Sequence, residues 1–212
     1  FDQRGVGHSK IESINDKNIN LNVMVEDLEA LRKKLNYAKF SIVGHSFGGA
    51  YAQAYAAKYP KNIEKLILTS SIGVDVAAKD GTVANMLSRL SDDDKVKYKY
   101  WTSAEQRKKD SRKASTEALR LVTKTYVYDQ KYVPEVEKIL LDMDEYDPRV
   151  LELVMKSMAL GYNVKGAFKN FKAPTLIIAC RQDFMGEENP IVLKENIPGS
   201  RLVFLNECSH CP

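Results

Sequence analysis

The sequence has few cysteines, a single tryptophan, little excess charge and no long apolar run. Only three cysteines, Cys180, Cys208 and Cys211, occur in 212 residues. An odd, sparse count argues against a secreted scaffold built on disulfides. The longest apolar runs, such as 66–68, are far too short to cross a bilayer. The 32 basic and 28 acidic residues leave a net charge of +4, so small an excess that it does not indicate nucleic-acid binding.

The rest of the composition is typical of a globular protein. With 44% hydrophobic and 28% charged residues, the chain can bury a sizeable core as one large domain or as a core with an insertion. It starts at Phe1 and no leader-like stretch follows, so we expect a fragment or a trimmed product. The compartment therefore stays open, with the cytoplasm as the default that the cysteine usage favours.

Apolar periodicity predicts alternating strands and helices at both ends of the chain. Residues 1–9, rich in glycine and polar side chains, are expected to form a loop. The pattern predicts helices at 21–35, 50–59 and 189–195, and strands at 40–43, 66–68, 174–179 and 201–205. Continuous apolar strands between helices are typical of a parallel sheet with helices on both faces. The predicted fold class is therefore α/β.

The middle of the chain, residues 72–167, carries helix signals and no convincing strand. Ser91 precedes three aspartates, and Asp147 precedes Pro148, which are both patterns of a helix start. Most of the tyrosines also lie here. We expect a helical insertion at 72–167 between a first core part at 1–71 and a second core part at 168–212.

Gly44-His45-Ser46-Phe47-Gly48 fits the G-x-S-x-G pattern, with a predicted strand before it and a predicted helix after it. A serine on so sharp a turn takes a strained backbone conformation, and bulky residues two positions away on either side would collide. Ser46 would stand at the carboxyl edge of the sheet, where the Phe47 N–H, at a helix start, could stabilise an oxyanion. The alternative is a glycine-bracketed turn with an idle serine.

A nucleophilic serine needs a base within hydrogen-bond reach, and the chain has only three histidines. His45 would point away from Ser46, and His8 lies in the opening loop without an acid to orient it. His210 follows the last predicted strand, at the edge where Ser46 should emerge. Asp183, just after the strand at 174–179, would hold the imidazole. The fallback acids are Glu187, Glu188 and Glu195.

The segment Cys-Ser-His-Cys at 208–211 also suggests a metal site. A lone C-x-x-C with one histidine lacks the second pair of ligands that makes such sites strong, and Cys180 alone cannot supply it. We therefore expect no metal and no cofactor. The cysteines are interpreted as small, partly buried side chains beside the loop of His210.

These motifs resemble the α/β-hydrolase superfamily and, within it, the proline iminopeptidase-like serine hydrolases of peptidase family S33. The resemblance is carried by Asp-Gln-Arg-Gly-x-Gly-x-Ser at 2–9, by Gly-His-Ser-Phe-Gly-Gly at 44–49, and by the order Ser46, Asp183, His210. It implies an α/β-hydrolase fold with a mostly parallel sheet, helices on both faces and a helical cap at 72–167. It also implies a nucleophile at Ser46, an acid at Asp183, a base at His210 and an oxyanion donor at Phe47.

The sequence departs from the family pattern in two respects. The family's first strands, with the loop that gives the second oxyanion donor, would lie before Phe1. Proline iminopeptidases typically show Gly-Gly-Ser-Trp-Gly, whereas Gly-His-Ser-Phe-Gly at 44–48 is the commoner form among esterases and general cap-bearing hydrolases.

The sequence thus predicts a serine hydrolase that cleaves a small-molecule ester or the N-terminal amide bond of a short peptide through an acyl-enzyme on Ser46. A peptide amine would need a carboxylate in the cap, with Glu105, Asp142, Asp144 and Glu145 as candidates. One alternative is a carboxylesterase for short acyl esters, with an apolar pocket lined by cap tyrosines. Another is a non-catalytic α/β-hydrolase fold that binds a ligand. We expect no nucleic-acid partner and no membrane span.

Overall fold

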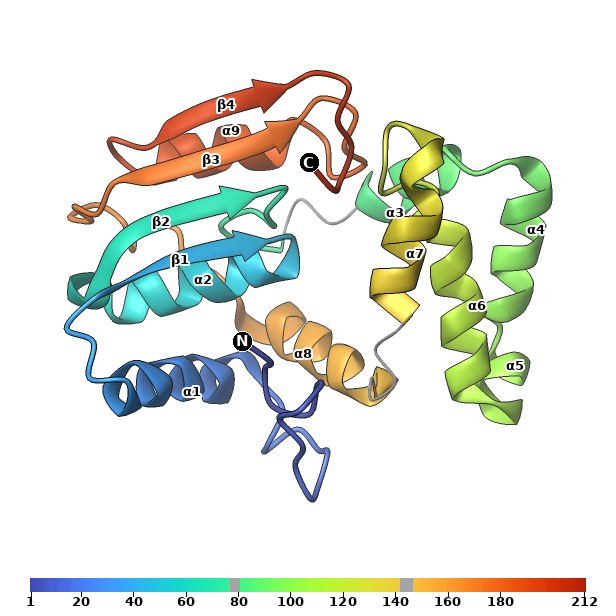
Figure 1. Ribbon diagram of the computed structural model, residues 1–212, viewed down its shortest axis with the longest axis horizontal. Coiled ribbons are helices and arrows are strands. Elements are labelled where there is room, and N and C mark those ends of the chain that lie inside the picture. The colour runs from blue at the N-terminus through green and yellow to red at the C-terminus, as the bar shows by residue number, and fades with distance from the viewer. Residues whose placement is uncertain (77–80, 142–146) are drawn as a thin grey trace.

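The computed structural model, which describes residues 1–76, 81–141 and 147–212, contains a four-stranded parallel sheet (Figure 1). The strands lie in chain order as β1 (Phe40–His45), β2 (Ile63–Thr69), β3 (Thr175–Cys180) and β4 (Arg201–Leu205). One row of the sheet aligns Gly44, Leu68, Ile177 and Leu202. All four predicted strands are therefore present, and their parallel register brings their carboxyl ends to one edge.

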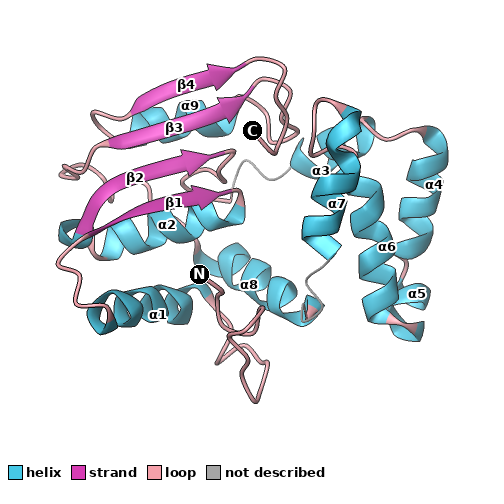
Figure 2. Cartoon of the chain, viewed as in Figure 1, coloured by secondary structure: helices cyan, strands magenta, loops and turns pink. Residues whose placement is uncertain are grey.

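The helices predicted around these strands are also confirmed (Figure 2). They are α1 (Leu21–Lys34), α2 (Phe47–Lys58) and α9 (Glu188–Asn196), and a 3-10 turn at Pro60–Asn62 follows α2. The Asn20 side chain accepts the Val23 N–H at 3.0 Å and so caps the start of α1. Helix α2 begins three residues before the predicted start, because tertiary packing at the elbow outweighs the low helix propensity of Gly48 and Gly49.

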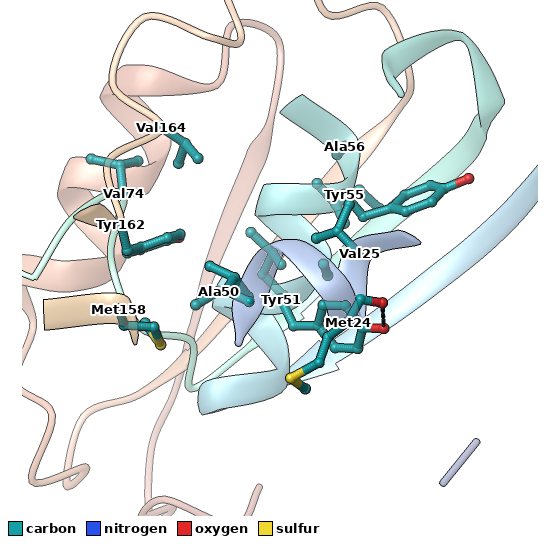
Figure 3. Close-up of a cluster of buried hydrophobic side chains, with 14 of the residues drawn as sticks. Met24, Val25, Ala50, Tyr51, Tyr55, Ala56, Val74, Met158, Tyr162 and Val164 are labelled. Atoms are coloured by element: carbon teal, nitrogen blue, oxygen red, sulfur yellow. Dashed lines mark hydrogen bonds between the residues drawn. The ribbon is translucent and has the colours of Figure 1, made fainter. Parts of the chain in front are cut away.

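Helices α1, α2 and α8 (Pro148–Gly161) bury a common apolar cluster, which Figure 3 shows in close-up. The small side chains of the alanine-rich α2 allow close approach to Met24 and Val25 of α1, and the Tyr51 hydroxyl donates to the Met24 carbonyl. Met158 of α8 is fully buried, and the hydroxyl of Tyr162, just after α8, donates to the Gly73 carbonyl at 3.0 Å. This packing holds the start of α2 firmly against the sheet.

Between β2 and β3 the described residues form helices and no strand of the sheet. Besides α8 these are α3 (Thr82–Ser88), α4 (Asp92–Trp101), α5 (Ala104–Lys109), α6 (Ser111–Thr123), a 3-10 turn at Gln130–Tyr132 and α7 (Val133–Leu141). The predicted caps are present: Ser91 Oγ accepts the Asp94 N–H at 3.1 Å, and Asp147 accepts the Arg149 N–H at 2.9 Å. Helices α3 to α7 lie toward the end of the sheet to which all four strands point (Figure 1). The boundaries of the cap at 72 and 167 stay a prediction.

The two faces of the sheet are buried to different degrees. The face that packs against the helices carries Leu66, Leu68 and Ile177, which are at most 1% exposed. Val43 of β1 points to the other face and is 67% exposed. A groove of about 550 Å³ follows β1, the edge strand, and is lined in part by Phe1, Leu28, Leu31, Leu35, Phe40 and Ile42. None of the described helices is both long and apolar enough to cross a membrane.

Candidate active site

Ser46 occupies a strained turn between β1 and α2. Its backbone has φ 52° and ψ −120°. This positive φ is one that residues other than glycine rarely adopt. Three backbone hydrogen bonds hold the turn. The Ser46 N–H donates to the Thr69 carbonyl at 3.0 Å, and the Ser46 carbonyl accepts from Gly49 at 3.0 Å and from Ile72 at 3.2 Å. The ends of two neighbouring strands thus maintain the conformation that presents this serine.

The structure changes the reason why glycines surround Ser46. A Cβ on Gly44 would lie 2.6 Å from the Gly48 carbonyl oxygen, so a side chain is excluded there as predicted. At Gly48, however, a Cβ would meet no atom of the described structure within 4 Å, so the predicted collision at that position was wrong. The close approach lies one residue later, because a Cβ on Gly49 would stand 2.0 Å from Ser71 Oγ.

The three predicted site residues lie together at the carboxyl edge of the sheet. His210 Nε2 is 2.8 Å from Ser46 Oγ, and His210 Nδ1 is 3.1 and 3.2 Å from the two carboxylate oxygens of Asp183. Asp183 follows β3 and His210 follows β4, while Ser46 ends the turn after β1. With the proton on Nδ1, the imidazole donates to Asp183 and its Nε2 accepts the hydroxyl proton of Ser46.

Asp183 is ionised in this environment although it is buried. Burial acts to raise its pKa, but the hydrogen bond from His210 and the Met185 N–H, which donates at 2.9 Å, hold the net pKa of Asp183 below its usual value. Both Asp183 and His210 are at most 5% exposed. A buried negative charge beside His210 favours the protonated imidazole that forms when a base accepts a proton.

Three aromatic rings surround His210, and the sequence pattern singled out none of them for this role. The centroids of Phe184, His45 and Tyr126 lie 4.5, 4.9 and 5.1 Å from that of His210. His45, set aside in the sequence analysis, is thus part of this site, and its Nδ1 is 3.1 Å from Thr69 Oγ1. Desolvation of the ring and the neighbouring His210 hold the pKa of His45 below its usual value.

The insertion contacts the loops of both the acid and the base. Ser209 Oγ donates to the Thr125 carbonyl at 2.8 Å, and the Cys211 N–H donates to the Tyr126 carbonyl at 2.8 Å. Arg89, just after α3, donates to the Gln182 carbonyl. The abundance of tyrosine in the insertion was visible in the sequence, but the pattern did not show which of them meets the base.

Two of the three cysteines are bonded to each other, which the sequence analysis did not foresee. Cys180 and Cys208 form a disulfide and are both buried, and Cys211 is a free, partly buried thiol. The expectation of small, partly buried side chains beside the loop of His210 agrees with their position. In the disulfide state neither sulfur can act as a zinc thiolate.

The remaining predicted residues lie as follows. Phe47 is the first residue of α2, so its N–H has no acceptor within the helix and lies next to Ser46. Glu187 pairs with Arg181 at 2.9 Å, so this fallback acid has a partner away from the imidazole. Exposed positions are occupied by His8, Glu105, Glu188 and Glu195. The candidates Asp142, Asp144 and Glu145 fall outside the described residues.

Comparison with known proteins decides the family. A family model described as the alpha/beta hydrolase fold matches residues 1–212. The chain belongs to this family. The abhydrolase domain-containing protein abhd-5.2 of Caenorhabditis elegans is 42% identical over 74 residues, which are 34% of this chain and 17% of that relative. The chain therefore matches only a small part of that relative's length.

Two further proteins are similar to almost the whole chain. A proline iminopeptidase of Saccharolobus solfataricus is 26% identical over an alignment of 221 positions, which covers 99% of this chain and 68% of the relative. The solved structure of 2-hydroxy-6-oxo-6-phenylhexa-2,4-dienoate hydrolase from Rhodococcus sp. strain RHA1 superposes with a TM-score of 0.70 at 20% identity, covering 97% of this chain and 70% of that one. At this identity the second likeness establishes the fold alone.

Proposed function

We propose that the chain is the catalytic part of a serine hydrolase that cleaves a small-molecule carboxylic ester, or the N-terminal amide bond of a short peptide, through an acyl-enzyme on Ser46. The observation that supports this most directly is the 2.8 Å contact between His210 Nε2 and Ser46 Oγ, with Asp183 on the other ring nitrogen. An idle serine in a glycine-bracketed turn would need no such aligned base.

In the acylation step, Ser46 Oγ attacks the carbonyl carbon of the substrate while His210 Nε2 takes the hydroxyl proton. The carbonyl oxygen becomes an oxyanion, to which the Phe47 N–H donates at the positive end of α2. Asp183 stabilises the imidazolium, which then protonates the leaving alkoxide or amine as its bond to the carbonyl carbon breaks. The acyl group remains on Ser46 Oγ.

In the deacylation step, His210 takes a proton from a water molecule, and the resulting hydroxide attacks the acyl carbon. The imidazolium then returns this proton to Ser46 Oγ as the ester bond to the enzyme breaks. The products are a carboxylic acid and the free enzyme. Every proton that is transferred in the cycle passes through His210 Nε2. The proposed nucleophile, acid, base and oxyanion donor are all residues of this chain.

The surroundings favour an ester over a peptide. Phe184 and Tyr126, whose ring centroids lie 5.5 Å apart, form an apolar wall beside His210, which suits an acyl chain. The elbow Gly-His-Ser-Phe-Gly also has the form common among esterases. The peptide alternative is supported by the likeness to the Saccharolobus proline iminopeptidase. That substrate would need a carboxylate for its amine, and Glu105 lies in the exposed first turn of α5.

The test compares hydrolysis of p-nitrophenyl butyrate and prolyl p-nitroanilide by the full-length protein. We expect turnover of the ester, and a loss of kcat/KM of about a thousandfold or more in Ser46→Ala. Ser41→Ala in β1 is the matched control and should keep wild-type turnover. Faster release from the prolyl substrate would favour the aminopeptidase. A folded wild type that releases neither product but retains a bound ligand would contradict hydrolysis. That result would favour the ligand-binding alternative.

A further inference from the structure

The disulfide joins the two loops that carry the acid and the base. Cys180 is the last residue of β3, three positions before Asp183, and Cys208 lies two positions before His210. The two Cα atoms are 5.0 Å apart. The bond therefore crosses from one loop to the other close to the contact between Asp183 and His210.

Hydrogen bonds also link these loops. The Gln182 N–H donates to the Cys208 carbonyl at 3.1 Å, and the Cys208 N–H donates to Gln182 Oε1 at 3.1 Å. Ser209 Oγ also lies 3.0 Å from the Gln182 carbonyl, which shares the one hydroxyl proton with the Thr125 carbonyl. Thermal motion can open each of these hydrogen bonds, whereas the S–S bond cannot open without a chemical step.

We propose that the Cys180–Cys208 disulfide positions the acid loop and the base loop of the active site, so that its reduction by a dithiol lowers turnover without weakening substrate binding. The inference rests on the function proposed above. The two cysteines act through Asp183 and His210 and take no part in the chemistry. Misplacing a reacting group by about 1 Å costs up to a hundredfold in rate, so loosening this contact is sufficient to affect catalysis.

The redox step is an ordinary thiol–disulfide exchange with a dithiol as the reductant. A thiolate of the dithiol attacks Cys208 Sγ, because Cys208 as a residue is 9% exposed against 3% for Cys180. The S–S bond breaks, and Cys180 leaves as a thiolate that takes up a proton. The second thiol of the reductant then releases Cys208, so that the protein gains two thiols and the reductant becomes a disulfide.

Cys211 lies only three residues from Cys208 and could in principle compete for the pairing. Its side chain is partly buried, and both burial and the negative charge of Asp183 raise the pKa of the Cys211 thiol. The thiolate that exchange requires is therefore disfavoured. The expected partner of Cys208 remains Cys180, and Cys211→Ser serves as a matched control for the experiment.

A disulfide that served stability alone would give a different pattern. It would change the melting temperature, and kcat would stay the same below the melting transition. A disulfide that positions the site changes kcat more than KM.

The experiment uses full-length protein purified without reductant, before and after dithiothreitol. We expect a linked peptide pair containing Cys180 and Cys208 in the oxidised sample. Reduction should lower kcat about tenfold, with KM within about twofold. Reoxidation should restore kcat. Cys211→Ser should respond as the wild type does, and the double variant C180A/C208A should have the low kcat with and without reductant.

Three results would overturn the proposal. The first is free Cys180 and Cys208 thiols in the unreduced protein. The second is an unchanged kcat after complete reduction. The third is an equal response of C180A/C208A to dithiothreitol, which would place the effect elsewhere.

A readout independent of any substrate separates this proposal from the proposed function. Reduction should speed amide hydrogen exchange in residues 181–185 and 207–211 of the folded protein. Faster exchange in a protein without hydrolase activity would contradict the function and support the link between the loops. Unchanged exchange would overturn the positioning role whether or not the protein is an enzyme.

Discussion

At the scale of single residues, we expect alanine substitutions at Gly48 and Gly49 to have opposite effects on stability, although the two glycines are neighbours in one helix. The Cβ of Gly49→Ala would overlap Ser71, which accepts a hydrogen bond from Gln53 Nε2 at 3.1 Å and donates to the Ile72 carbonyl at 2.8 Å. Relieving the overlap means moving the end of β2 or the start of α2. We expect a loss of about 1 to 3 kcal/mol in the free energy of unfolding, measured by urea denaturation.

Gly48→Ala is the matched control for this prediction. A Cβ there meets nothing within 4 Å of the described structure, and alanine favours the helix over glycine by about 0.5 to 1 kcal/mol. The variant should be as stable as the wild type or slightly more stable. Equal losses in the two variants would contradict the packing described at the elbow.

Tyr126 is the residue through which the insertion contacts the base most directly. Its ring packs edge-on against His210 and also contacts Phe184. Tyr126→Ala removes one wall around the imidazole, so kcat for an ester should fall about tenfold. Tyr128→Ala, at an exposed position of the same loop, should leave kcat unchanged. A similar kcat for both variants, measured by steady-state kinetics, would show that the ring does not position the base.

At the scale of secondary-structure elements, Glu29 links α1 to the end of α2. Its carboxylate accepts from Arg32 at 2.7 Å, from the Tyr55 hydroxyl at 2.7 Å and from Asn62 at 3.1 Å. The hydrogen bond from Arg32 outweighs burial and, with those from Tyr55 and Asn62, lowers the pKa of Glu29 to about 2.

A depressed pKa in the folded state stabilises the protein above the pKa of the unfolded chain, and this stabilisation is lost as the pH falls through the folded value. The loss for Glu29 spans roughly pH 4.5 to pH 2. Glu29→Gln cannot titrate, so its melting temperature should be lower than that of the wild type at pH 7 and approach it below pH 4. A constant difference across this range in thermal scans would contradict the network.

Local sequence signals were sufficient for the elements that position the site. The strands had short apolar runs, α1 had an apolar stripe, and Ser91 and Asp147 are the caps that their sequence context predicted. The start of α2 was placed too late, because its first turn contains Gly48 and Gly49. Glycine lowers helix propensity, and only packing against the sheet reveals why a helix begins there.

At the scale of the whole molecule, the sheet topology brings together residues that are far apart in the sequence. Ser46, Asp183 and His210 each follow a parallel strand, so their meeting at one edge could be predicted from strand order alone. Their aromatic neighbours could not, because Tyr126 and Phe184 approach His210 through loop conformations that no periodic pattern encodes. The pairing of Cys180 with Cys208 likewise depends on the approach of two loops.

The central claim is that His210 activates Ser46, and labelling of the full-length protein with a fluorophosphonate probe tests it most directly, because the probe reacts with activated serines. Wild-type protein should be labelled on Ser46, and Ser46→Ala should not be labelled. His210→Ala should react at least about a hundredfold more slowly, since the hydroxyl would lack its base. Circular dichroism would verify that each variant is folded. A folded wild type that resists the probe, or a His210→Ala variant that reacts at the wild-type rate, would contradict the account.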